Sequence, residues 1–131
     1  MSKKGQRAEH WQQEPEDHDF PAAANYLRLL VPEQVSASIV DELRGASTVN
    51  HQAKDLMRAS RLPLLPIDNP HVAKDLKRVA KGALLSPVLL VRGRAADGLA
   101  LIVADGYHRI CASYHLDEDA DIPCRIAELP S

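Results

Sequence analysis

The chain has 131 residues, a size typical of one domain, and 45% of them are hydrophobic while 26% are charged. This composition excludes a chain that is disordered throughout, and the formal net charge of −2 argues against a surface devoted to sequence-independent nucleic-acid binding. No apolar stretch approaches the length of a membrane-spanning helix, and the N-terminus lacks the apolar core of a signal peptide, so we expect a cytoplasmic protein.

The first 60 residues predict a polar arm followed by a helical segment. Residues 1–20 are mostly polar and charged, which indicates a mobile arm. Residues 21–60 predict three helices: an Ala- and Leu-rich one that ends before Pro32, one from Pro32 to Gly45, and one from about Asn50 to Ala59.

Residues 61–131 predict an α+β domain, a small mixed β-sheet with flanking helices. Short apolar runs indicate strands at 62–67, 86–91, 99–103 and 122–126. One helix is expected from Pro70 to about Ala80, with Asn69 as its N-cap, and another over 107–115. The expected order is strand, helix, strand, strand, helix, strand.

Cysteine and histidine usage gives no sign of a metal site. Cys111 and Cys124 form no CxxC pair, and the six histidines show no regular ligand spacing. We therefore expect two reduced thiols and no bound metal held by the protein alone.

The segment VADGYHRICA, residues 103–112, carries the candidate site. A strand that runs through Asp105 and Gly106 directly into a helix leaves several amide N–H groups without partners at one point, where an anion binds well. Gly106 permits a tight turn, Arg109 adds a planar cation and His108 a titratable donor. Asp-Gly is also a common turn, so these residues alone leave a phosphate site and an ordinary turn about equally open.

The sequence from Leu62 to Ile126, about half of the chain, resembles the ParB/sulfiredoxin superfamily. The resemblance is carried by LPLLPIDNPHVAKDLKRVAKGALLSPVLLV, by ADGYHRICASYHL and by IPCRI. In that superfamily, which includes ParB partition proteins, sulfiredoxins and free serine kinases, a strand–Gly–His–Arg–helix element lies against nucleotide phosphates. The resemblance implies ATP or another nucleoside phosphate, with magnesium as a candidate companion ion, bound by residues 105–109, namely Asp105, Gly106, Tyr107, His108 and Arg109.

Departures from the family pattern narrow the expected activity. Sulfiredoxins place their catalytic cysteine directly before the His-Arg pair, where this chain has Tyr107, so we expect no sulfiredoxin activity. The motif is closer to the Asp-Gly-His-His-Arg form of free serine kinase-like members. A kinase also needs a carboxylate base, for which position alone suggests Glu33, Glu42 or Asp55.

A second wall of the site is expected from other segments. Lys54 and Arg58 lie on neighbouring turns of one expected helix, with surface salt bridges as the alternative. His71 and Lys74 begin the next helix, and Ser86 is a candidate for the floor.

Three functions remain open. The leading one is a nucleotide- or phosphate-binding protein with ATP-dependent phosphoryl transfer or hydrolysis, acting on a small molecule through a catalytic residue not yet assigned. The second is a non-catalytic interaction or regulatory module whose N-terminal helices dock a protein partner. The third is a DNA-associated ParB-like protein that uses the basic face over 74–81. ParB proteins carry a helix-turn-helix after this core, whereas this sequence ends at Ser131, so we do not expect partition-type DNA clamping.

Overall fold

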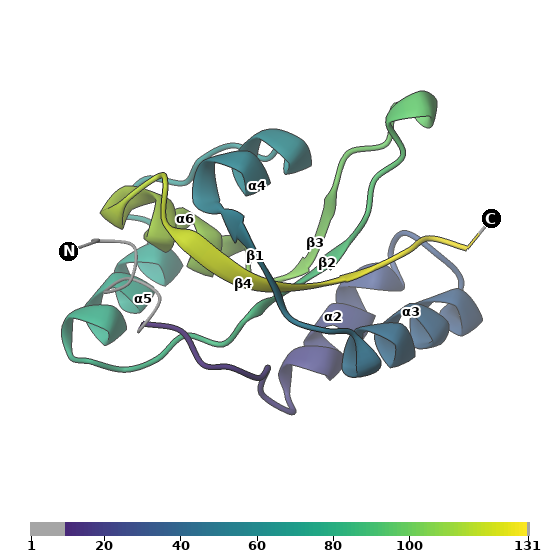
Figure 1. Cartoon of the computed structure of the whole chain (residues 1–131), viewed down its shortest axis with the longest axis horizontal. Helices are drawn as coiled ribbons and strands as arrows, with labels where there is room; N and C mark the ends of the chain where they lie inside the picture. Colours follow the sequence, from purple (N-terminus) through teal and green to yellow (C-terminus); the bar gives the residue numbers. More distant parts are fainter. Residues whose placement is uncertain (1–9, 131) are drawn as a thin grey trace.

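The structure, a computed structural model, describes residues 10–130 and contains a four-stranded mixed sheet with helices on both faces (Figure 1). The strand order is β1-β4-β2-β3, with β2 and β4 parallel and the other neighbours antiparallel. The strands are β1 (Val49–Gln52), β2 (Val88–Val91), β3 (Ile102–Asp105) and β4 (Asp121–Ala127). The expected α+β class with a small mixed sheet is confirmed.

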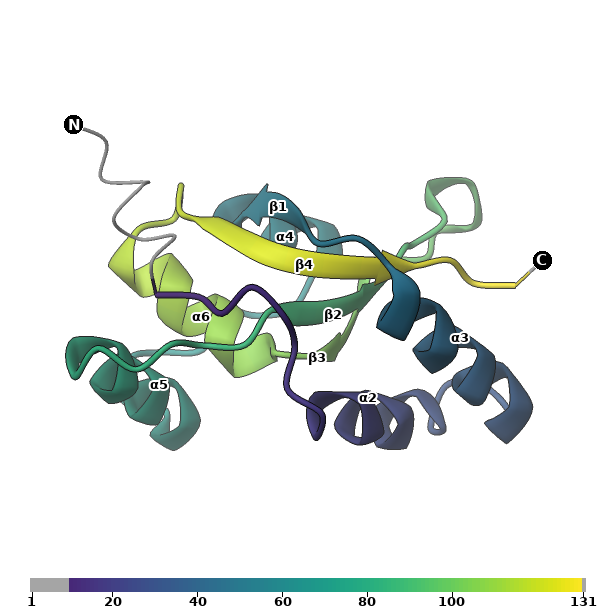
Figure 2. The same cartoon turned by 60° about the horizontal axis from the view of Figure 1, so that its bottom comes forward.

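Five helices surround this sheet in the described part of the chain. They are α2 (Asp19–Leu27), α3 (Glu33–Gly45), α4 (Ala53–Ser60), α5 (Pro70–Ala80) and α6 (Tyr107–Leu116), with a short 3₁₀ turn, η1 (Ala95–Asp97), between β2 and β3. Figure 2 shows α2 and α3 along one face of the sheet. Helices α4, α5 and α6 supply buried residues to the core on the other face.

The central strand β2 is buried on both faces because its side chains alternate between the two halves of the core. Val88 and Leu90 belong to the cluster with α4, α5 and α6, whereas Leu89 and Val91 belong to the cluster with α2 and α3. This explains why the sequence shows a continuous apolar run here rather than alternation.

The expected helix after Asn69 is confirmed, including its start. The Asn69 side-chain oxygen accepts hydrogen bonds from the amides of His71 (3.0 Å) and Val72 (3.2 Å), and Pro70 occupies the first helical position. The expected helix over 107–115 and the final strand are confirmed as α6 and β4.

The expected strand over 62–67 is wrong. This segment is irregular, because Pro63 and Pro66 lack the amide donors that a ladder needs. Instead it lies along α6: the Tyr107 hydroxyl donates to the Pro63 carbonyl, and His115 Nε2 lies 2.7 Å from the Leu65 carbonyl. Its apolar side chains reach the core without pairing in the sheet.

The expected helix from Asn50 is also wrong at its start, since residues 49–52 form β1. This strand pairs antiparallel with β4, with Val49 opposite Cys124 and Gln52 opposite Asp121, and α4 begins only at Ala53. Pairing with the edge of β4 therefore outweighs the helical preference of residues 49–52. Residues 21–60 therefore contribute a strand to the same sheet as residues 61–131 and are not wholly helical.

The polar segment at the N-terminus is packed from His10 onward, and the part of the expected mobile arm before it lies outside the described residues. Leu85 N donates to the His10 carbonyl (2.7 Å), and Gln12 N donates to the Leu85 carbonyl (2.8 Å). Between these bonds, Trp11 is buried in the core with Leu85. We call residues 10–18 the N-terminal strap; the expectation of a mobile arm is wrong for this part.

The two cysteines are unbonded and buried, as expected. Burial raises the pKa of the Cys124 thiol to about 12 and also raises that of Cys111. Within residues 10–130, no three His, Cys, Asp or Glu side chains are grouped to hold a metal ion. No helix in the same range combines the length and the apolar character needed to cross a bilayer.

Replacing Trp11, the chain's one tryptophan, tests whether the strap is part of the core. Trp11 is 7% exposed, so Trp11→Ala should lower the free energy of unfolding by about 3 kcal/mol. Urea denaturation followed by circular dichroism measures this loss. The control Leu29→Ala removes a side chain that is 82% exposed and should change stability by less than about 0.5 kcal/mol. Equal stability of the two variants would show that the strap is not docked.

Candidate functional site

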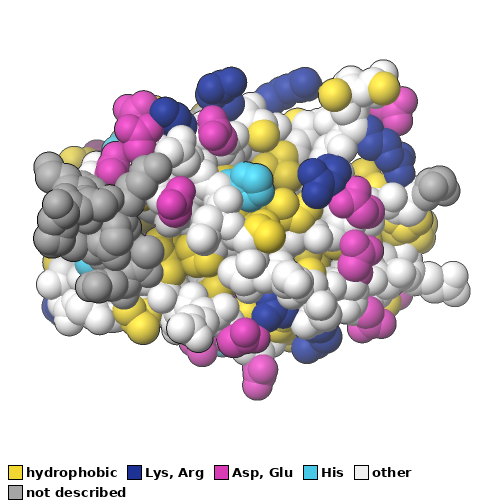
Figure 3. Space-filling model, viewed as in Figure 1, with side chains coloured by type: hydrophobic (Ala, Val, Ile, Leu, Met, Phe, Trp, Pro, Cys, Tyr) yellow, Lys and Arg dark blue, Asp and Glu magenta, His cyan; other side chains and the backbone are white. Residues whose placement is uncertain are grey.

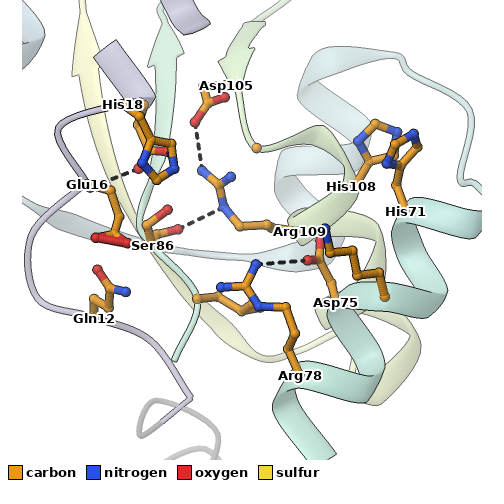
Figure 4. Close-up of a pocket in the computed structure, with 14 residues that line it drawn as sticks. Gln12, Glu16, His18, His71, Asp75, Arg78, Ser86, Asp105, His108 and Arg109 are labelled. Carbon is orange, nitrogen blue, oxygen red and sulfur yellow. Dashed lines mark hydrogen bonds and ion pairs between the residues drawn. The ribbon is translucent and has the colours of Figure 1, made fainter. Parts of the chain in front are cut away.

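A cleft of about 300 Å³ opens where the N-terminal strap, α5 and the start of α6 meet (Figure 4). Fourteen residues line it, and Leu85 is the one apolar side chain among them. The strap side contributes Gln12, Glu16, His18 and Asp19; α5 contributes His71, Lys74, Asp75 and Arg78; the floor and the α6 side contribute Leu85, Ser86, Asp105, Gly106, His108 and Arg109. Such a lining suits a charged, strongly polar ligand.

The turn from β3 into α6 has the geometry expected from the sequence. Gly106 has φ +113°, which side chains rarely adopt, and a Cβ there would lie 2.5 Å from Val88 Cγ1. Its carbonyl accepts the Ile110 amide (3.0 Å), and no side chain caps the first turn of α6. The first amides of α6 therefore begin at the edge of the cleft without a capping side chain.

Arg109 is fixed in the cleft by three hydrogen bonds. Its Nε donates to the Ser86 carbonyl (2.9 Å), and its Nη2 donates to the Pro87 carbonyl (3.2 Å) and to Asp105 Oδ2 (2.9 Å). Figure 4 shows the guanidinium between Asp105 and Ser86. Nη1 has no partner among residues 10–130, so two of the five N–H donors remain for a ligand.

Asp105 and Asp19 bring two carboxyl groups together at the end of the cleft nearest α2. Burial raises the pKa of Asp105; the Arg109 guanidinium opposes this, and the neighbouring Asp19 carboxyl adds to it. Asp19 is itself buried and accepts the Glu16 amide (2.9 Å). The pair makes Asp105 a better proton acceptor than an exposed aspartate.

Asp75 is a buried carboxyl group on α5. Its nearest ionic partner is Arg78 Nη1, at 3.9 Å, and no hydrogen bond reaches it from the described residues. Burial raises the pKa of Asp75, and the positive charges of Arg109 and Arg78 oppose the rise. Asp75 is thus a charged group whose hydrogen-bonding capacity is unused by the protein.

The rings of His71 and His108 lie next to each other on the α5–α6 side of the cleft, with centroids 4.6 Å apart and planes tilted by 40°. Burial lowers the pKa of His108, and His71 acts in the same direction. His108 is therefore mostly neutral at neutral pH. The Tyr107 ring lies 5.6 Å from that of His108 but does not line the cleft, and its hydroxyl donates to the Pro63 carbonyl instead.

Three of the five residues expected in the second wall lie in the cleft beside Gly106 and Arg109. His71, Lys74 and Ser86 line the cleft. Lys54 and Arg58 do not: Lys54 Nζ pairs with Asp119 (2.6 Å) and Arg58 pairs with Asp55 (3.6 Å), so the salt-bridge alternative is correct for both.

The expected base candidates also lie elsewhere. Glu33 pairs with Arg28, and Glu42 accepts the backbone amide of Glu128. Asp55 faces a different hollow, of about 370 Å³, between α4 and the β2–β3 connection. That hollow is mostly apolar, and Figure 3 shows hydrophobic side chains gathered on this face of the molecule.

Helical spacing in the sequence links Asp75 and Arg78 to His71 and Lys74, the two α5 residues expected in the second wall. His71, Lys74, Asp75 and Arg78 follow the spacing i, i+3, i+4, i+7, which places them on one face of a helix. The strap residues carry no such signal, because only the pairing of Trp11 with Leu85 brings them to the cleft.

Replacing Gly106 tests whether the turn depends on close packing. Gly106→Ala should lower stability by about 2–4 kcal/mol, because a Cβ clashes with Val88 and φ is positive. Urea denaturation provides the measurement. In the control Gly45→Ala, the new Cβ meets no atom within 4 Å, and stability should stay within about 1 kcal/mol or rise. Similar losses in both variants would contradict the close approach.

Searches of protein-family models, of curated proteins and of solved structures found no match to this chain.

Proposed function

We propose that the cleft binds a phosphorylated ligand, with nucleoside phosphates as the leading class. The observation that carries this proposal is the convergence of the α6 N-terminus with Lys74, Arg78 and Arg109 on one open cleft. Amides at a helix N-terminus and cationic side chains are the groups that bind phosphate in proteins. Three cations and a helix end at one place favour phosphate over a neutral ligand.

The distribution of charge supports a ligand with two chemically different ends. Figure 4 shows Gln12 and Glu16 on the strap side, opposite Arg78 and the α5–α6 side. Carboxylate and amide oxygens accept hydrogen bonds from hydroxyl groups. In the proposed pose the phosphates lie against α6 and the sugar hydroxyls face the strap.

Resemblance to the ParB/sulfiredoxin superfamily supports the same assignment. In that superfamily the strand–Gly–His–Arg–helix element lies against nucleotide phosphates, and here Gly106, His108 and Arg109 line the cleft. We propose a ParB/sulfiredoxin-like fold for the sheet and helices after residue 61. The irregular segment at 62–67 is a departure from the strand expected there.

Phosphoryl transfer or hydrolysis is the candidate activity. A bound nucleoside triphosphate supplies the phosphoryl group, and magnesium, when it accompanies the phosphates, offsets their charge. Arg109 and Lys74 hold the phosphates in this account. Three carboxyl groups of the cleft, those of Glu16, Asp19 and Asp105, replace Glu33, Glu42 and Asp55 as candidates for accepting the proton of an acceptor hydroxyl. Cys111 takes no part, because it is buried and its thiol pKa is raised.

An exposed apolar patch favours a second function, docking of a protein partner by the N-terminal helices. Tyr26, Leu29 and Leu30 lie at the end of α2 and the connection to α3, and all three are exposed. This surface is formed by other residues than the cleft, so the two functions are compatible.

Calorimetric titration with ATP, ADP and CTP, each with and without magnesium, tests the proposed function. Wild-type protein should bind at least one of them, and Lys74→Gln/Arg78→Gln should weaken that binding about 10- to 100-fold through loss of charge-assisted hydrogen bonds. Arg109 is unsuitable for this test because it also donates hydrogen bonds to Ser86, Pro87 and Asp105. Its replacement would therefore disturb the structure of the cleft as well as the binding of a ligand.

The matched control for this titration is Lys54→Gln/Arg58→Gln. It removes the same charge from α4, outside the cleft, and should leave affinity unchanged. Absence of heat with all three nucleotides, or an equal loss in both double variants, would contradict a phosphate site in the cleft.

A further inference from the structure

The buried carboxyl group of Asp75 is unusual within the cleft because nothing in the described chain donates a hydrogen bond to it. Its side chain is 11% exposed, and its closest ionic contact, Arg78 Nη1, is 3.9 Å away. A buried carboxylate is normally held by several donors, since leaving its oxygens unpaired is unfavourable. Because Asp75 lines the cleft, its carboxyl group is open to a hydrogen-bonding group that enters there.

The charges around Asp75 come from every wall of the cleft. Positive or titratable nitrogen groups face it from α5 and α6, and carboxyl groups line the same cleft from the strap, the start of α2 and the end of β3. The nitrogen groups are those of His71, Lys74, Arg78, His108 and Arg109; the carboxyl groups are those of Glu16, Asp19 and Asp105, with His18 beside them. Despite the cations, burial leaves the pKa of Asp75 above its ordinary value. Asp75 is thus prepared to accept a proton.

An arriving phosphate meets the same cations that surround Asp75. An ionised Asp75 would repel that phosphate, whereas a protonated Asp75 presents an O–H donor to a phosphate oxygen. We propose that Asp75 joins the bound phosphate as a carboxylic acid, so that the cleft takes up the anion and a proton together. This inference rests on the proposed phosphate site and names the group that couples the site to pH.

The sign of the pH effect follows from this coupling. A proton taken up on binding makes affinity for the anion fall as pH rises, by up to tenfold for each pH unit when one full proton is coupled. His108 lines the same cleft, and an imidazole also gains a proton beside a negative charge. The contribution of Asp75 therefore has to be isolated with a variant.

Titrating wild-type protein and the variant Asp75→Asn with ADP isolates the contribution of Asp75 to the pH dependence of binding. The asparagine amide donates a hydrogen bond at every pH, so this variant should bind ADP at least as tightly as wild type at pH 5.5 and about tenfold more tightly at pH 8. Calorimetry at pH 7.5 in two buffers of different ionisation enthalpy should show fewer protons taken up by Asp75→Asn. Protons that ADP itself gains on binding contribute equally to both titrations, so they cancel in the difference between the two proteins.

The control for this titration is Asp55→Asn, which removes an exposed carboxylate from α4 and should match wild type in affinity and in proton uptake. Equal proton uptake by wild type and Asp75→Asn would overturn the inference. Weaker ADP binding by Asp75→Asn would also overturn it, because the carboxylate would then be accepting a donor of the ligand. No ADP binding by wild type, when ATP and CTP also give no heat, would instead remove the proposed function itself.

A direct measurement on wild-type protein covers the case in which Asp75→Asn does not fold. The ¹³C shift of the Asp75 carboxyl carbon distinguishes an acid from a carboxylate. In the ADP complex at pH 7 it should move toward the acid value, and a shift that stays at the carboxylate value would contradict the inference.

Discussion

The close approach of the β3–α6 turn to β2 is the constraint on which the cleft depends. Gly106 lies so near Val88 that no side chain fits between them, and this contact sets where α6 begins. From that position Arg109 reaches the carbonyls of Ser86 and Pro87 as well as Asp105. One turn thereby fixes the helix end, the guanidinium and the carboxyl group relative to one another. Such fixed geometry lets donors bind an anion without being reordered first.

The remaining walls of the cleft are held by the core of the protein rather than by the cleft itself. Trp11 anchors the strap beside Leu85, and the Asn69 cap sets the start of α5, from which His71 and Lys74 project. The result is a site in which cations and carboxyl groups lie close together. Ligand binding in such a site depends on which carboxyl groups are ionised, and burial makes Asp75 and Asp105 the ones that respond.

Local patterns in the sequence predicted the parts of the structure that local interactions determine. The Asn69-Pro70 cap, the buried run of β2 and the turn at Gly106 all follow from neighbouring residues. The elements that were predicted wrongly depend on contacts between segments far apart in the sequence. Residues 49–52 form a strand because β4 lies beside them, residues 62–67 do not because their prolines prevent it, and Trp11 is buried because its partner is 74 positions away at Leu85. The spacing of α5 places Asp75 on the same helix face as His71 and Lys74, but its burial depends on distant segments that one sequence does not reveal.

The central claim is that phosphate binds where α6 begins. Amide ¹H–¹⁵N spectra recorded during titration with ADP test it most directly, because they report on each backbone position of the cleft. Phosphate bound at this position should give the largest shifts at Gly106, His108 and Arg109, with smaller ones along α5 near Lys74. Shifts confined to the apolar hollow between α4 and the β2–β3 connection, or no shifts at all, would contradict it.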